Sequence, residues 1–148
     1  MKEIIARVKN YAKHPPITAV KNISIKDVSK IMSEKKVGMV IIVDDKDIER
    51  PIGVVTERDI VRAIAQNINL NEPVSTLMSS PVITIDVDDP IWKAADIMRE
   101  HNIRHLVVME KNKLYGAISI RDLVFEESVL ESIASLKYTP PESGRIES

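Results

Sequence analysis

Two short stretches of this chain repeat one pattern of residues that could bind a charged, hydroxyl-bearing ligand. Residues 53–59 read Gly-Val-Val-Thr-Glu-Arg-Asp and residues 116–122 read Gly-Ala-Ile-Ser-Ile-Arg-Asp, in a chain with only four glycines. A Thr or Ser hydroxyl where a strand becomes a helix can cap that helix or meet an anion at its positive end. The Asp three residues later could accept the vicinal hydroxyls of a ribose, and the adjacent Arg could bind a phosphate as a planar fork.

The same pattern also has a purely structural interpretation. The sequence [Thr/Ser]-x-x-Asp is a capping box, in which the hydroxyl and the carboxylate satisfy free backbone N–H groups of the helix and the Arg is merely solvated. Because the Gly recurs together with the Arg-Asp pair in both copies, the ligand interpretation gains weight. From the residues alone, both interpretations stay open.

The repetition extends well beyond the two motifs. A shift of 66 positions places Pro15 on Pro81, and after the apolar strands a shift of 63 positions places Asp59 on Asp122. The first copy therefore carries three additional residues, which we assign to the charged hairpin turn at 44–50. Polar turns tolerate such insertions. The two halves of the chain are copies of one unit.

Hydrophobic periodicity predicts the same β-α-β-β-α order in each copy. The first copy predicts an extended segment at 17–20, a helix with apolar Ile25, Val28, Ile31 and Met32, a strand at 39–43 and a helix at 57–66. The second predicts a segment at 82–87, a helix with Ile91, Ala94, Ala95, Ile97 and Met98, a strand at 106–109 and a helix from 120 onward. The strands at 39–43 and 106–109 lack polar alternation, which is typical of burial on both faces. Ser24 with Asp27, and Asp89 before Pro90, predict the N-termini of the first helix of each copy.

We predict an α/β (α+β) fold in which the two repeats pack sheet to sheet as one pseudo-twofold domain with two clefts. A unit of about 60 residues with one small sheet cannot bury enough surface alone. We assign residues 1–70 to repeat 1 with an N-terminal lead-in, 71–127 to repeat 2 and 128–148 to a helical extension with a polar tail, with 67–73 as the connection. The extension carries an apolar stripe that fits either a docking helix or packing on its own domain: Val129, Leu130, Ile133 and Leu136.

The composition narrows the class of protein. With 44% hydrophobic residues, 29% charged residues and a net charge of −1, the chain is typical of a globular protein rather than one held on nucleic acid or anionic lipid by bulk charge. It has no cysteine, which excludes disulfides and thiolate catalysis and fits a reducing, cytoplasmic environment. The longest apolar run, at 37–43, is too short to span a bilayer. A glycine-rich phosphate loop and a recognisable pair of catalytic carboxylates are both absent from the sequence, so we do not predict an enzyme.

The doubled unit resembles a tandem pair of CBS domains, the cystathionine-beta-synthase type regulatory motif, also called a Bateman module. The resemblance rests on the Thr-containing first strand, the helix that ends Ile-Met, the apolar strand after 36–38 or 102–104, and the closing Gly-x-x-[Thr/Ser]-x-x-Asp. It covers about residues 8 to 126. It implies clefts that bind AMP, ADP or ATP, sometimes S-adenosylmethionine, and two modules that join as a homodimer. We predict no cofactor besides this ligand.

The resemblance also implies roles for particular residues. One cleft would use the motif residues Thr56, Arg58 and Asp59, with Val54 against the base and Ile83 from the other repeat. The second cleft would use Ser119, Arg121 and Asp122, with Ala117 against the base and Ile17 from the other repeat. The Asp would hold the ribose hydroxyls, and the Thr or Ser would lie near ribose or phosphate.

The resemblance implies that the two sites are unequal. Just before the buried strand, where the family often has a basic phosphate contact, the second copy has Arg104-His105 and the first has Gly38-Met39. The family's frequent small-Pro step in that strand is missing from both copies. We therefore predict that the site at Asp122 binds nucleotide more strongly and that the site at Asp59 is weaker or empty.

Several residues have competing interpretations. His105 could be a structural histidine at a strand edge instead of a phosphate neighbour. With His101 it forms His-x-x-x-His, a zinc-binding spacing on one helix face, but the helix should end near Asn102 and a third ligand is not evident, so we predict no metal site. Trp92 and Tyr115 could stack on a base, although Trp92 in the first turn of a helix better fits packing or a dimer contact.

We therefore predict a regulatory protein that binds adenine nucleotides, senses energy state and signals occupancy to an unidentified partner protein. The remaining 20 or so residues leave no room for an attached enzyme or channel, so we expect the pair to act as a stand-alone module. Two alternatives stay open. The first is a structural or interaction module without nucleotide, and the second is a module that binds nucleic acid or S-adenosylmethionine.

Overall fold

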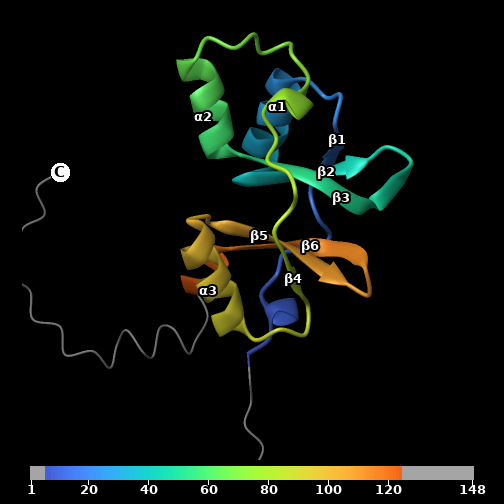
Figure 1. The fold of residues 1–148 in the computed structure, drawn as a ribbon, viewed down its shortest axis with the longest axis vertical. Helices are drawn as coiled ribbons and strands as arrows, with labels where there is room; N and C mark the ends of the chain where they lie inside the picture. The colour runs from blue at the N-terminus through green and yellow to red at the C-terminus, as the bar shows by residue number, and fades with distance from the viewer. Residues whose placement is uncertain (1–5, 125–148) are drawn as a thin grey trace, which may run out of the picture.

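The computed structural model describes residues 6–124, which form two consecutive units with the predicted β-α-β-β-α order (Figure 1). The first unit consists of β1 (Thr18–Val20), α1 (Ile25–Lys35), β2 (Met39–Asp44), β3 (Asp47–Thr56) and α2 (Glu57–Ala65). The second consists of β4 (Thr84–Asp86), α3 (Ile91–His101), β5 (His105–Glu110), β6 (Lys113–Ser119) and α4 (Ile120–Val124). Short 3-10 helices, η1 (Val8–Asn10) and η2 (Val74–Thr76), precede the units. No helix within residues 6–124 has the length and apolar character needed to cross a membrane.

The two units build three-stranded sheets of identical topology. In each sheet the first strand runs parallel to the middle strand and the last strand runs antiparallel to it, in the orders β1-β2-β3 and β4-β5-β6. Thr18 pairs with Ile41 and Thr84 with Val107, positions related by the shift of 66 found in the sequence. The first strands are shorter than predicted, with three residues each.

The sheets face each other and the helices cover their outer faces, as Figure 1 shows. Met39, Ile41 and Val43 of β2 meet Val107 of β5 in the layer between the sheets. The alternate residues of β2, Val40 and Ile42, pack on the other side with the apolar face of α1. The predicted burial of β2 on both faces is thus confirmed, and each such Val or Ile contributes about 1.5–3 kcal/mol to folding.

The segment that precedes each unit packs on the other unit. Val8 is completely buried in the core of the second unit, and Val74 is completely buried in the core of the first. Backbone bridges fix both segments, since Lys13 pairs with Ala117 and Ser79 pairs with Val54. This exchange brings each of these segments, called here the lead-in of its unit, beside the motif of the opposite repeat.

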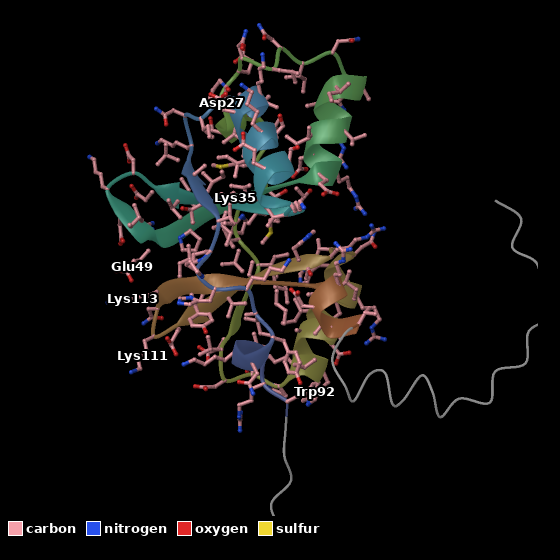
Figure 2. All side chains as sticks on the ribbon, turned by 180° about the vertical axis from the view of Figure 1, so that it is seen from behind. Asp27, Lys35, Glu49, Trp92, Lys111 and Lys113 are labelled. Carbon is pink, nitrogen blue, oxygen red and sulfur yellow. The ribbon has the colours of Figure 1, made fainter. Side chains whose placement is uncertain are left out.

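The three additional residues of the first copy lie in β3 and not in the turn where we predicted them. Both hairpins have two-residue turns, because Asp44 pairs with Asp47 and Glu110 pairs with Lys113. The register of β3 shifts opposite Val43 and Asp44, so the insertion is absorbed as an irregularity of the strand. Figure 2 shows the two hairpins side by side, with Glu49 of the first 3.9 Å from Lys113 of the second.

The two predicted helix caps have different outcomes. Ser24 caps α1, because its Oγ accepts a hydrogen bond from the backbone N–H of Asp27 at 3.0 Å. The prediction for Asp89 was wrong, because Pro90 occupies the N-cap position of α3. Oδ2 of Asp89 instead accepts the N–H of Asp86 at 3.0 Å and closes the preceding turn. The predicted apolar stripe at 129–136 lies outside the described residues.

Candidate functional site

Two clefts lie between the repeats, with volumes of about 280 Å³ and about 330 Å³. The first, called here the Asp59 cleft, is lined among others by Val54, Thr56, Arg58, Asp59, Ile83, Arg104 and His105. The second, the Asp122 cleft, is lined among others by Ile17, Ala117, Ser119, Arg121, Asp122, Arg104 and His105. The structure thus brings all the residues of the sequence-based site into two clefts. Whether they bind a nucleotide stays a prediction.

One feature of the clefts departs from the sequence argument. Arg104 and His105, which we assigned to the Asp122 cleft, line both clefts. The five residues common to both linings are called here the shared wall: Gly38, Met39, Glu57, Arg104 and His105. The contrast between Gly38-Met39 and Arg104-His105 therefore does not by itself make the Asp122 cleft the more basic one.

The capping interpretation of the motif is confirmed in both copies. Oδ2 of Asp59 accepts hydrogen bonds from the backbone N–H of Thr56 at 2.9 Å and from its hydroxyl at 3.1 Å. Oδ2 of Asp122 accepts the same two bonds from Ser119, at 2.8 and 3.0 Å. Each hydroxyl in turn accepts the backbone N–H of the Asp, at 3.4 and 3.2 Å. The hydroxyl proton is therefore already donated, which makes Thr56 and Ser119 positioning groups.

The cap leaves a ligand-binding role open for both carboxylates. Both capping bonds that each carboxylate accepts go to Oδ2, so Oδ1 of Asp59 and of Asp122 can still accept a donor from a ligand. Asp59 is 9% exposed, and its Oδ1 lies 3.9 Å from a guanidinium nitrogen of Arg62. A buried carboxylate that is already oriented by its own helix is well prepared to hold hydroxyl groups.

The charges of the clefts differ through residues that the sequence argument missed. The Asp59 cleft has Arg58, Arg62 and Arg104 against the carboxylates of Glu57 and Asp59. The charged residues of the Asp122 cleft are the cations Lys13, Lys36, Arg104 and Arg121 and the carboxylates Glu57 and Asp122. Lys13 comes from the exchanged lead-in, so only the packing of one repeat on the other reveals it. The Asp122 cleft is the more positive of the two.

His105 lies half-buried at the start of β5, against Gly38. A Cβ atom on Gly38 would lie 3.0 Å from Nε2 of His105 and 3.5 Å from Oε1 of Glu57, so the glycine makes room for both side chains. Burial lowers the pKa of His105 below its usual 6.5, although the nearby carboxylates of Glu57 and Asp122 oppose this shift. The imidazole is therefore mainly neutral at pH 7 and can both donate and accept one hydrogen bond.

Other residues considered from the sequence lie elsewhere. Tyr115 stacks on the ring of His14, with ring centroids 4.2 Å apart, which gives one face of its ring a structural partner. Trp92 is 66% exposed at the start of α3, at the end of the molecule away from the first unit (Figure 2). His101 ends α3 whereas His105 begins β5, so the two do not share a helix face. Within residues 6–124, no three His, Asp or Glu side chains are arranged to hold a metal ion.

The structure has two repeats with exchanged lead-ins and two clefts between them. This arrangement agrees with the comparison to known families. A CBS domain model matches the chain twice, at residues 8–66 and 74–128. The chain therefore belongs to the CBS-domain family and contains a pair of these domains.

The chain is similar to solved CBS-domain proteins in sequence and in fold. The CBS domain protein PAE2072 from Pyrobaculum aerophilum, solved in complex with AMP, is 40% identical with a TM-score of 0.80, over 88% of this chain and 99% of that one. The CBS domain pair of protein MJ0100, solved with 5′-methylthioadenosine and S-adenosyl-L-methionine, is 30% identical with a TM-score of 0.76, over 89% and 100% of the two chains. An uncharacterized 17.7 kDa protein of Acidianus ambivalens is 38% identical over 80% of this chain. The match spans 68% of that relative's length and less than two thirds of several others.

Proposed function

We propose that this protein is a regulatory module that binds adenine nucleotides, with AMP as the primary ligand, in the clefts between its repeats. The observation that carries the proposal is that each cleft combines an oriented Asp carboxylate, which has one oxygen left for a donor, with an arginine and an apolar wall. In the Asp59 cleft that wall contains Val54 and Ile83, and in the Asp122 cleft it contains Ala117 and Ile17. The AMP complex of a relative with 40% identity supports the same ligand class.

The Asp122 cleft is the stronger site in this proposal. Its two lysines, Lys13 and Lys36, add positive charge where a phosphate would lie. In the Asp59 cleft, Arg62 lies beside the carboxylate of Asp59, which reduces what it can offer a phosphate. Electrostatic attraction by partly exposed lysines is modest and falls with salt, so we expect a difference in affinity and not an absolute preference.

The regulatory role follows from binding between two repeats. A ligand that contacts both repeats favours one relative arrangement of them, and a partner protein can recognise that arrangement without any catalysed reaction. Val61 and Ile64 of α2 and Val124 of α4 are exposed, which supports a homodimer that covers them. The cytoplasm as the site of action and the identity of the partner stay predictions.

Calorimetric titration of the protein with AMP, ADP, ATP and S-adenosyl-L-methionine tests this function. We expect AMP to release or absorb heat with saturable binding. The double variant Asp59→Asn, Asp122→Asn should lose it, while Asp27→Asn should bind as the wild type does. Asp27 is a matched control because it is also an acid in the first turn of a helix but is exposed on α1.

Three outcomes would decide between the candidate functions. Binding of S-adenosyl-L-methionine without AMP would favour the second candidate, which the complex of the 30% identical relative suggests. Binding of RNA or DNA without any of the four small ligands would contradict a nucleotide sensor. The absence of every one of these interactions would favour a structural module.

A further inference from the structure

The shared wall between the clefts contains a single side chain with a permanent positive charge. Of its five residues, all within the described part of the chain, only Arg104 is an arginine or lysine, and Glu57 carries the opposite charge. Arg104 is exposed, and its long side chain is therefore free to turn toward either cleft.

The backbone of the shared wall is fixed from both repeats. The carbonyl oxygen of Arg104 accepts the N–H of Ile120 at 2.8 Å, and that of Gly38 accepts the N–H of Glu57 at 3.0 Å. The backbone at Arg104 is thus held by the first residue of α4, and the backbone at Gly38 is held by the first residue of α2. His105 and Glu57 approach each other around Gly38. The backbone at Arg104 and Gly38 is thus anchored, whereas the exposed side chain of Arg104 can reorient.

We propose that the two clefts compete for a phosphate-bearing ligand, so that filling one weakens binding in the other, because both use the one guanidinium of Arg104. This proposal rests on the function proposed above. A phosphate in the Asp122 cleft binds the guanidinium of Arg104. Glu57 is then the charged residue of the shared wall that still faces the Asp59 cleft. The Asp59 cleft then has Arg58 and Arg62 against Glu57 and Asp59, with no excess of positive charge. A second phosphate in that cleft binds weakly.

The size of the effect follows from the contact that is lost. A charge-assisted hydrogen bond to a phosphate is about twice as strong as a neutral one, and its absence weakens binding by about tenfold or more. A ligand without a phosphate does not need Arg104. Adenosine should therefore fill the two clefts independently.

The proposal is tested by calorimetric titration of AMP into three proteins: the wild type, Asp122→Ala and Arg104→Met. In Asp122→Ala the Asp59 cleft is the remaining site, and we expect it to bind AMP at least about tenfold more tightly than the second AMP binds to the wild type. If AMP fills the Asp59 cleft of the wild type first, the second AMP is compared with the AMP that binds Asp59→Ala, in which the Asp122 cleft is the remaining site. In Arg104→Met, both AMP molecules should bind more weakly than the first AMP binds to the wild type, and the two should bind independently of each other.

The outcomes separate this proposal from the proposed function. Two AMP molecules that bind the wild type independently would overturn the competition between the clefts and leave nucleotide binding intact. The same would follow if the second adenosine bound more weakly than the first by the same factor as AMP does. The coupling between the clefts would then not involve the phosphate. Failure of the wild type to bind AMP at all would overturn both. Circular dichroism of Arg104→Met checks its fold, and because Arg104 is exposed we expect no change.

Discussion

The Asp59 and Asp122 clefts are built from the same motif but are completed by different lead-ins. The lead-in at 79–83 contributes Ser79 to the lining of the Asp59 cleft. The lead-in at 13–17 contributes Lys13 to the lining of the Asp122 cleft. The motif carboxylates and their caps are nearly identical, with hydrogen bonds between 2.8 and 3.4 Å in both copies. Duplication has therefore preserved the oriented Asp, and the exchanged segments set the charge around it.

The docking of the two lead-ins should respond very differently to an added methyl group. A Cβ on Gly116 would lie 2.0 Å from the backbone oxygen of Lys13, whereas a Cβ on Gly53 would first meet the sulfur of Met78 at 2.6 Å. A backbone segment cannot step aside as a flexible Met can. We expect Gly116→Ala to lower the free energy of unfolding by about 3 kcal/mol or more and Gly53→Ala by about 1 kcal/mol. Urea denaturation measures both, and equal losses would contradict the rigid docking of the first lead-in.

Removal of the motif carboxylates should separate the clefts by affinity. Asp122→Ala should weaken the AMP-binding step at the Asp122 cleft by roughly ten- to a hundredfold, since hydrogen bonds to a charged group are worth about 1.5–3 kcal/mol. Asp59→Ala should change that step by less than about threefold. Both variants also lose a helix cap, worth about 1 kcal/mol, so the two melting temperatures should fall by similar amounts. The reverse ranking in the titration would refute the asymmetry of the clefts.

Substitution of the residues that the two lead-ins contribute should reduce or invert the difference in AMP affinity between the clefts. Lys13→Ser should lower AMP affinity at the Asp122 cleft by about two- to fivefold, and Ser79→Lys should raise it at the Asp59 cleft by a similar factor, because each moves one partly screened charge. Both side chains are exposed, so stability should not change. Titrations at two salt concentrations check this. An effect that does not shrink at high salt would show that the lysine acts otherwise than by its charge.

The smallest expected effect concerns His105 and pH. Since burial holds the pKa of this imidazole below its usual 6.5, the folded protein binds fewer protons than the unfolded chain. The neutral His105 therefore contributes fully to stability above pH 6.5, and this contribution is lost as the pH falls through the lowered pKa of His105. We expect the melting temperature of His105→Gln to fall less than that of the wild type between pH 7 and pH 5. A steeper fall in the variant would contradict a buried neutral His105.

The sequence predicted the fold well because the fold repeats and its helices and strands have local signals. The shift from 66 to 63 positions is visible when the chain is aligned with itself. The unbroken apolar strand at 39–43 and the cap at Ser24 depend only on neighbours along the chain. Asp89 was misassigned as a cap because Asp-Pro fits two positions of a helix start equally well. The additional residues of β3 were placed in the turn because a register shift leaves no pattern in a charged segment.

The site was predicted less completely, because its residues are brought together by the packing of the repeats. Thr56, Asp59, Ser119 and Asp122 are linked by their motif, which is visible in the sequence. That Arg104 and His105 line both clefts depends on the pseudo-twofold arrangement of the sheets. That Lys13 lines the Asp122 cleft depends on the exchange of the lead-ins. Neither relation has a sequence spacing that could reveal it.

The most direct test of the account is the structure of the protein crystallised with AMP at a concentration equal to that of the protein. We predict one nucleotide per chain in the Asp122 cleft, with its ribose hydroxyls on Oδ1 of Asp122, its base against Ala117 and its phosphate beside Lys13 and Arg104. A nucleotide bound only in the Asp59 cleft would contradict the asymmetry. Crystals that remain free of nucleotide in both clefts, even at saturating AMP, would contradict the central claim.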